Sequence, residues 1–354
     1  MKYIFSLAVI FLISCTTRTK LPFEEYELSV TEVEIVNEFF LDFDLNNPFR
    51  LIAYDSVIIV HDRIMINDET FFLRVVNAHN GNSKRVFGRE GRGPQEFLFP
   101  IELSRTPGSD HILTANNRSM FEIKLIQLDS LIVGSGEFVS SIYRNFNVGF
   151  SRIHSLKTPR YIGTGFFGRD RYAIADTSGS ITKLWGEYPF PATPKMTLES
   201  QPIAYQSRMV VHSSGNRVAS VAIRSPNFEL FTLDGDSLTY VNRINYRPVS
   251  IHDESGSGVI SVQYLDDNVN GYSSLDANDQ FIYALFSGKL SSEQDATYSD
   301  TIIVFDWDGN PVQKIILPLQ VSQISVNPSN EYLYTLTYDS NEAPVMQKFR
   351  ILNK

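Results

Sequence analysis

The feature that most constrains the fold of this 354-residue chain is a strand–turn–strand unit that recurs along most of its length. Short runs of β-branched and aromatic residues end in tight polar turns, and further strand-like runs return from them. Such turns lie at residues 77–81, 128–130, 233–236 and 306–310. Asn-Gly and Asp-Gly pairs suit two-residue hairpin loops because both central positions favour a positive φ. A unit that repeats about every 40–50 residues is typical of a β-propeller, whose blades are four-stranded sheets.

The repeat predicts an all-β, six-bladed propeller over residues 25–354, with few and short helices. The last predicted unit holds three strand-like runs, whereas residues 32–36 form a strand-like run without a unit of their own. We expect this run to complete the sixth blade and close the ring, which removes two exposed sheet edges. A β-sandwich with an N-terminal arm is the alternative. The six units are expected at residues 46–96, 97–157, 158–200, 201–248, 249–320 and 321–354, the third being the least regular.

The N-terminus has the features of an export signal. Lys2 gives a positively charged start, and residues 4–13 are apolar except for Ser6. Ten residues suit the hydrophobic segment of a signal peptide, whereas a membrane-spanning helix needs about 20. The following Leu-Ile-Ser-Cys, which ends at Cys15, resembles the lipobox of bacterial lipoproteins. The resemblance implies a signal peptide over residues 1–14, a lipid-bearing Cys15 and a tether over residues 15–24; an ordinary signal peptide with an incidental cysteine is the alternative.

A lipid on Cys15 would fix the location of the protein. Each buried lipid CH₂ contributes about 0.8 kcal/mol, so several acyl chains hold a protein firmly on a membrane. Residues 16–20 carry no acidic run of the kind that marks export to the cell surface in some lipoproteins. We therefore expect an outer-membrane lipoprotein that faces the periplasm, with the cell surface as the alternative.

Composition excludes several classes of function. Acidic residues outnumber basic ones by 40 to 31, and the formal net charge of −9 argues against binding of nucleic acid. A single cysteine excludes an intramolecular disulfide, a multi-cysteine zinc site and an iron–sulfur cluster. We expect no cofactor.

A glycine-rich segment, Phe-Gly-Arg-Glu-Gly-Arg-Gly-Pro-Gln-Glu-Phe at residues 87–97, is followed by Pro100. It resembles the connection between blades in NHL-type and TolB-like propellers, in which glycines allow a tight crossing. With the lipobox, the whole chain resembles the TolB-like six-bladed propeller lipoproteins of diderm bacteria, a group without an assigned activity. A phosphate-binding loop is the alternative for this segment, but it lacks the Gly-Lys-Ser/Thr ending and the following helix.

No catalytic set is recognisable in the sequence. The Asp-x-Asp-Gly-Asn run at residues 306–310 resembles part of a calcium-binding loop, but a hairpin turn explains it better. The acidic runs at 266–268 and 276–279 are expected to be solvated turns. Six histidines occur roughly once per unit but out of phase, so we expect surface or turn residues and not a metal ring: His61, His79, His111, His154, His212 and His252.

These observations favour a non-catalytic binding or scaffolding module in the cell envelope, monomeric, with an envelope protein or peptide as partner. Arg89 and Arg92 are the candidate contacts, because exposed guanidinium groups bind carboxylates well; solvated loop charges are the alternative for both. A metal-assisted hydrolase or lyase with its site in the central channel is the alternative function. A sugar-binding lipoprotein is a third and would require a flat aromatic platform.

Overall fold

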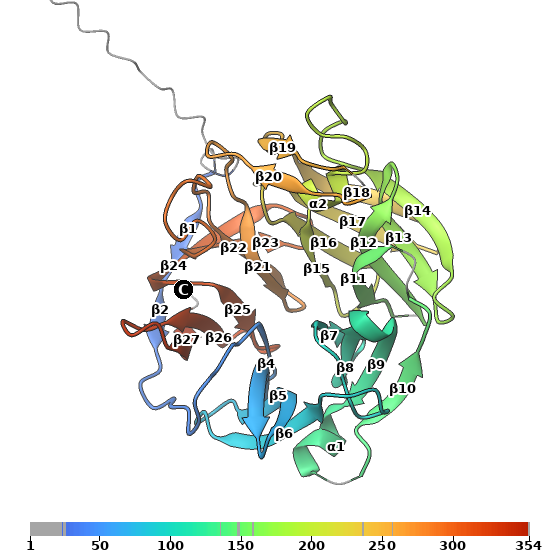
Figure 1. Cartoon of the computed structure of the whole chain (residues 1–354). Coiled ribbons are helices and arrows are strands. Elements are labelled where there is room, and N and C mark those ends of the chain that lie inside the picture. The colour runs from blue at the N-terminus through green and yellow to red at the C-terminus, as the bar shows by residue number, and fades with distance from the viewer. Residues whose placement is uncertain are drawn as a thin grey trace, which may run out of the picture.

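Six β-sheets are arranged around one axis like the blades of a wheel (Figure 1). The computed structural model describes residue 23 and residues 26–352, apart from residues 135, 147, 148, 158, 236 and 257. The predicted signal peptide and Cys15 lie outside the described residues. Consecutive strands of each blade pair antiparallel, and the prediction of an all-β, six-bladed propeller is confirmed.

Blades 1 to 3 follow one another along the chain. Blade 1 contains β3 (Arg50–Ala53), β4 (Val57–Ile66), β5 (Glu69–Asn77) and β6 (Ser83–Arg89). Blade 2 contains β7 (Ile101–Thr106), β8 (Ser109–Asn117), β9 (Glu122–Gln127) and β10 (Val139–Tyr143), with the 3-10 helix η1 (Arg118–Met120) and the helix α1 (Leu128–Val133) between strands. Blade 3 contains β11 (Phe150–Ser155), β12 (Arg160–Phe167), β13 (Asp170–Asp176) and β14 (Ile181–Glu187).

Blades 4 to 6 complete the wheel. Blade 4 contains β15 (Ser207–Val211), β16 (Arg217–Ala222), β17 (Phe228–Asp234) and β18 (Ser237–Ile244), and α2 (Gln201–Ala204) precedes it. A separate hairpin of β19 (Ile251–Asp253) and β20 (Val262–Tyr264) follows. Blade 5 contains β21 (Tyr272–Ala277), β22 (Phe281–Phe286), β23 (Ser299–Asp306) and β24 (Pro311–Val321); blade 6 contains β25 (Gln323–Val326), β26 (Tyr332–Tyr338) and β27 (Pro344–Ile351).

The N-terminal strands add to the last two blades. β2 (Val33–Ile35) pairs antiparallel with β27, with Val33 opposite Ile351, and so forms the outer strand of the blade 6 sheet. β1 (Ser29–Thr31) pairs parallel with β24 as a fifth strand of blade 5, which the sequence did not predict. The first strands of neighbouring blades contact each other around the axis, from β3 through β7, β11, β15 and β21 to β25 and back to β3.

Three local predictions were wrong. Residues 150–155 form the first strand of blade 3 and not the end of the second unit, because β11 pairs with β12. Residues 251–264 form the separate hairpin, so blade 5 begins only at Tyr272. The expected turn at 128–130 is the start of α1, which buries Leu128 and Leu131 on one side and ends at Gly134 with a φ of 78°.

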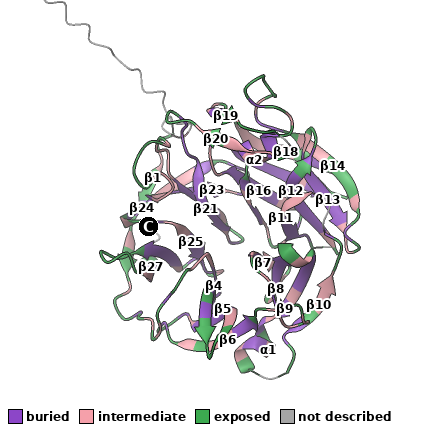
Figure 2. Cartoon of the chain, viewed as in Figure 1, coloured by how far each residue is buried: buried purple, intermediate pink, exposed green. Residues whose placement is uncertain are grey.

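The core lies between the blades, where the sheets pack face to face. Phe228 of blade 4 stacks on Phe305 of blade 5 with ring centroids 4.2 Å apart. Buried residues gather in the inner strands and exposed ones in the outer strands and loops (Figure 2). In the described part of the chain, no helix is both long and apolar enough to span a bilayer.

The antiparallel order gives the wheel two different faces. Turns between the first and second strands and between the third and fourth strands lie on one side, which we call the turn face. Turns between the second and third strands lie on the other side together with the links between blades, and we call it the connection face. A first strand therefore runs from the connection face to the turn face along the axis.

Candidate binding site in the central channel

The first strands of the blades carry charged side chains toward the axis. β-strand side chains alternate in direction, so Arg152 and His154 of β11 point to the same side of their strand. A cavity of about 40 Å³ on the axis is lined by Arg50, Arg105, His154 and Asp276 among others. The charged or titratable residues of this channel come from five blades: Arg50, Glu102, Arg105, Arg152, His154, Arg208 and Asp276.

Arg105 and Asp276 form an ion pair that links four blades. Arg105 of blade 2 donates from Nη1 to the Asp276 carboxylate of blade 5 at 2.5 Å. Its Nη2 donates to the carbonyl oxygens of Ala53 in blade 1 and Val326 in blade 6, both at 2.7 Å. The other Asp276 oxygen accepts the Val326 N–H at 2.9 Å and the Ser325 hydroxyl. Burial alone would lower the pKa of Arg105, but Asp276 raises it above its usual value.

Arg152 and Glu102 form a second ion pair in the channel. Arg152 Nη1 lies 2.7 Å from Glu102 Oε1, and 26% of the Arg152 side chain is exposed. Burial would raise the pKa of Glu102, but the positive charges of Arg152 and Arg50 hold it below its usual value. Glu102 is therefore ionised at neutral pH and its charge is shared with Arg152.

Arg50 and Arg208 have no such partner. Among the described residues, neither guanidinium makes a hydrogen bond or an ion pair, and the Nε atom of each is buried. Burial lowers the pKa of Arg50, and it lowers that of Arg208 to about 9, helped by the positive charges of Arg152 and Arg50. A guanidinium group is effectively always protonated in proteins, so both side chains are charged at pH 7. Each is half-buried, so it faces the channel and not the packed core.

The channel is positively charged in a protein whose overall charge is −9. Arg105 and Asp276 cancel each other, and Glu102 offsets one of the three remaining guanidinium groups. His154 stays neutral because burial lowers its pKa to about 4. The residual charge is two positive units, carried by a narrow site inside the wheel.

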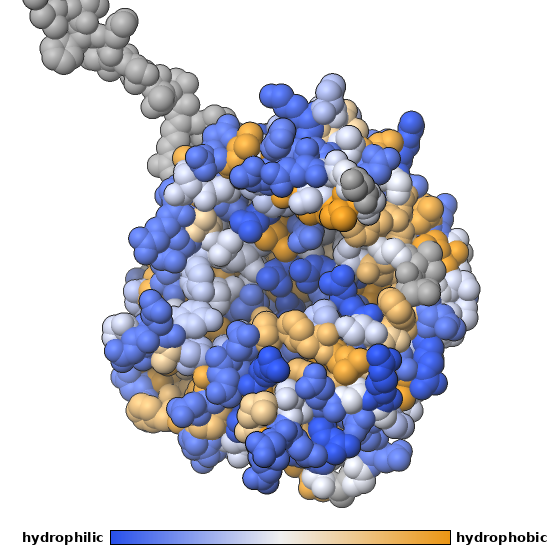
Figure 3. Space-filling view, in the orientation of Figure 1, coloured by the Kyte–Doolittle hydropathy of each residue, from blue (hydrophilic) through white to orange (hydrophobic). Residues whose placement is uncertain are grey.

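Two wider cavities flank the charged layer. On the connection face, a cavity of about 230 Å³ is lined by Arg152 with Ser151, Thr164, Ser207 and others. On the turn face, a cavity of about 330 Å³ includes Arg105 in its lining. Figure 3 shows a hollow at the centre of the wheel with hydrophilic residues in its depth. A ligand with one anionic group and a polar remainder could therefore occupy the channel and one flanking cavity.

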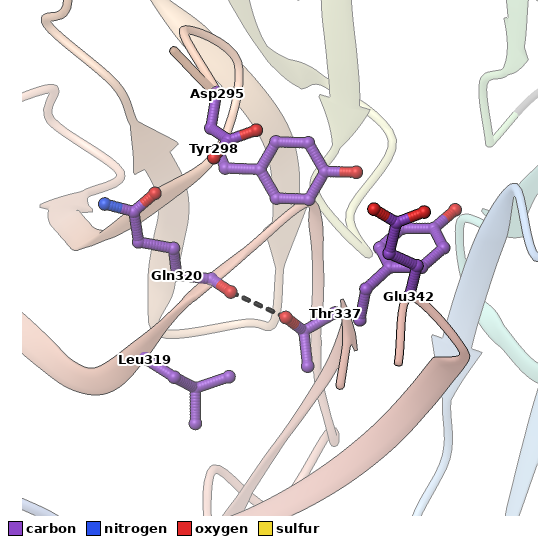
Figure 4. Close-up of a pocket in the computed structure, with 7 residues that line it drawn as sticks. Asp295, Tyr298, Leu319, Gln320, Thr337 and Glu342 are labelled. Atoms are coloured by element: carbon purple, nitrogen blue, oxygen red, sulfur yellow. Dashed lines mark hydrogen bonds between the residues drawn. The ribbon is translucent and has the colours of Figure 1, made fainter. Parts of the chain in front are cut away.

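A further depression lies between blades 5 and 6 (Figure 4). Its volume is about 570 Å³, and Asp295, Tyr298 and Glu342 contribute to its lining. Thr337 Oγ1 donates to the Gln320 carbonyl at 2.7 Å across this lining. None of the residues that line this depression comes from the first strands. Its charged groups are carboxylates, whereas those of the channel are mainly guanidinium groups.

The predicted contact residues lie outside the channel. Arg89 ends the outer strand of blade 1 and forms ion pairs with Glu69, at 3.0 Å, and with Glu96. Hydrogen bonding to Glu96, with Glu69, raises the pKa of Arg89. Arg92 is exposed in the connection that follows. In that connection the Glu96 carboxylate occupies the place that a side chain at Gly91 would take, which explains this glycine. Binding of a partner by Arg89 and Arg92 stays a prediction.

Two expectations about titratable residues were wrong. His61 and His154 are buried and not in turns, and burial lowers the pKa of each to about 4. Asp276 is a buried channel residue and not part of a solvated turn. Asp306 does cap a hairpin turn, accepting the N–H groups of residues 308 and 310 at 3.0 and 2.8 Å. Among the described residues, no group of three or more His, Cys, Asp or Glu is placed to hold a metal ion.

The channel arginines were missed by reading the sequence for motifs. Arg50 and Arg208 each lie in a short and otherwise mostly apolar first strand, Arg-Leu-Ile-Ala from Arg50 and Ser-Arg-Met-Val-Val around Arg208. A cation within such a run is unusual because charged side chains are rarely buried without a partner. An arginine recurs in the first strands of blades 1 to 4, and this repetition is the signal that could have revealed the site.

Comparisons with known proteins agree with the fold. Residues 23–329 match the family described as TolB-like 6-blade propeller-like. No curated protein matches the sequence significantly. A crystal structure of a DUF4221 family member from Bacteroides vulgatus superposes with a TM-score of 0.54 at 12% identity, covering 91% of this chain and 99% of that chain. Luciferin-regenerating enzyme gives a TM-score of 0.46 at 11% identity, covering 91% and 95%. The family match spans well over half of the chain, and the protein therefore belongs to the TolB-like six-bladed propeller family.

Proposed function

We propose that this protein is a membrane-anchored lipoprotein whose propeller acts as a non-catalytic binding module in the cell envelope, with the central channel as its anion-binding site. The observation that carries the binding role is the pair Arg50 and Arg208, which line the channel without a partner among the described residues. The buried Nε–H of each guanidinium has no acceptor among the described residues, so an anion that enters the channel would gain strong charge-assisted hydrogen bonds. The lipobox ending in Cys15 supports the anchor and the envelope location.

The charge of the channel favours this role over a metal-assisted hydrolase or lyase. A divalent cation is held by several oxygen, nitrogen or sulfur donors that converge on one point. The two carboxylates of the channel are already paired, Glu102 with Arg152 and Asp276 with Arg105. The surrounding positive charge would repel a cation and attract an anion.

The anchor is tested by lipid labelling in a diderm bacterium that expresses the full chain. With an alkyne analogue of palmitate, the wild-type protein should be labelled and should sediment with membranes. The Cys15→Ser variant should lose both properties, whereas Ser14→Ala, which keeps a small residue before the cut, should retain them. A Cys15→Ser protein that is still labelled or still sediments with membranes would refute the anchor.

The binding role is tested by thermal unfolding of the purified propeller in a panel of small anions and matched neutral compounds. We expect anions, and not neutral compounds, to raise the Tm of the wild type, because a ligand that binds only the folded state stabilises it. The Arg50→Gln/Arg208→Gln variant should lose the shift, and Arg63→Gln, which removes an exposed arginine of β4, should keep it. An equal shift in both variants would show that the channel is not the site.

A further inference from the structure

The channel has the charge of a site for a doubly charged anion. Arg50, Arg152 and Arg208 oppose Glu102, which leaves two positive units in the layer where these side chains meet. A monoanion would leave one of these units uncompensated, whereas a dianion neutralises both. The requirement follows from the residues present and from the neutral state of His154.

The space on the axis suits one compact anionic group. The cavity beside Arg50 and His154 has a volume of about 40 Å³, and Arg105, Val211 and Ala277 of its lining also line the wider cavity on the turn face. Its walls come from several blades, so guanidinium groups can approach a ligand from different directions. A tetrahedral oxyanion presents acceptor oxygens in several directions, and guanidinium groups bind phosphate through paired N–H donors.

Buried donors in this layer also lack acceptors. The Nε–H groups of Arg50 and Arg208 are buried without a hydrogen-bond partner among the described residues. Burial of unsatisfied polar atoms is uncommon in folded proteins, and each such atom calls for an explanation. An oxyanion on the axis would supply acceptors to the two guanidinium groups and relieve their mutual repulsion.

We propose that Arg50 and Arg208, assisted by Arg152, bind a dianionic phosphate group in the central channel. This inference rests on the proposed binding function and names its ligand class. The phosphate belongs either to inorganic phosphate or to a small phosphate monoester whose polar remainder lies in the connection-face cavity. That cavity provides Ser151, Thr164 and Ser207, which could hydrogen-bond such a remainder.

Isothermal titration calorimetry of the propeller at pH 7.5 tests the phosphate site. The ligands are inorganic phosphate, glucose 6-phosphate, sulfate, nitrate and succinate. We expect the tetrahedral dianions to bind at least tenfold more tightly than nitrate or succinate. If glucose 6-phosphate binds more tightly than inorganic phosphate, the ligand is a phosphate monoester. If inorganic phosphate binds more tightly, the ligand is the free ion. Either result supports the proposal.

Substitutions separate an anion site from a structural role. Arg50→Gln and Arg208→Gln should each weaken phosphate binding by at least tenfold, with Arg63→Gln as the matched control for lost charge. Glu102→Gln should strengthen phosphate binding, because it releases Arg152 and raises the net charge of the site. A loss of stability cannot by itself produce tighter phosphate binding. Glu102→Gln therefore tests the anion site even if Arg50→Gln or Arg208→Gln folds poorly.

Two failures are distinguishable. If nitrate or succinate binds as tightly as phosphate and binding still depends on Arg50 and Arg208, the phosphate assignment is wrong and the binding function stands. If no anion binds the wild type, or if binding is unchanged in both arginine variants, the anion-binding channel is refuted together with its ligand class.

Discussion

The Arg105–Asp276 ion pair should hold blades 1, 2, 5 and 6 together, and its removal is the sharpest test of how the wheel is stabilised. In Arg105→Met, Asp276 keeps its bonds from Val326 and Ser325 but loses the cation that compensates its charge. The carbonyl oxygens of Ala53 and Val326 also lose their donor. Breaking one half of a buried ion pair destabilises a protein by about 3–5 kcal/mol.

The effect can be measured by urea unfolding followed by tryptophan fluorescence, with a thermal scan beside it. At roughly 2.1 cal/mol/K of unfolding entropy per residue, a loss of about 3–5 kcal/mol lowers the Tm of a chain of this length by roughly 4–7 °C. Arg63→Gln, which removes an exposed arginine, should stay within about 0.5 kcal/mol of the wild type.

The double variant Arg105→Met/Asp276→Leu supplies the internal control. Replacing both members of a buried ion pair with apolar residues is often neutral, because no uncompensated charge remains. The double variant should therefore be more stable than Arg105→Met alone. A loss below about 1 kcal/mol in Arg105→Met, or a double variant less stable than the single one, would show that this ion pair does not hold the four blades together.

Three further predictions follow from the same structure. The free energy of unfolding should fall as pH decreases from about 6.5 toward 4. In that range the unfolded chain protonates His61 and His154, whereas the folded protein, in which both pKa values are near 4, does not. Urea unfolding at several pH values measures this free energy, and a value that does not change with pH would contradict the prediction. Gly91→Ala should lower the Tm, because the added Cβ would displace the Glu96 carboxylate from its bonds with Arg89 and the Gly93 N–H. An unchanged Tm would show that Glu96 can move away without loss of stability. In a Cys15→Ser background, the double variant Val33→Cys/Ile351→Cys should form a disulfide under oxidation. Residues directly opposite each other in antiparallel strands lie close enough for a disulfide. Absence of the disulfide would contradict the pairing of β2 with β27.

Much of the fold could be predicted because its signals are local. Turns rich in Asn, Asp and Gly separate strand-like runs, and their spacing alone indicates blades. The boundaries near residue 150 were not predictable in this way. A strand-like run carries no mark of whether it ends one blade or begins the next, and the pairing of β11 with β12 decides it.

The channel could not be predicted from local patterns because its residues are distant in sequence. Arg50, Arg152 and Arg208 are brought together only when the first strands meet around the axis. Arg89 drew attention because it lies in a conspicuous glycine-rich segment, yet two carboxylates of the chain already contact it. The glycine-rich segment reflects the backbone conformation that the connection needs, whereas the unpaired arginines of the channel indicate the candidate binding site.

Crystallography of the propeller soaked in tungstate, a heavy tetrahedral dianion, would show directly whether the central channel binds an anion. The anomalous scattering of tungsten gives its position independently of the electron density of the protein. The account predicts a tungsten peak on the axis, within hydrogen-bond reach of the guanidinium groups of Arg50 and Arg208, and its loss in crystals of Arg50→Gln/Arg208→Gln. Tungsten bound only on the outer surface, or an empty axis in the wild type, would contradict it.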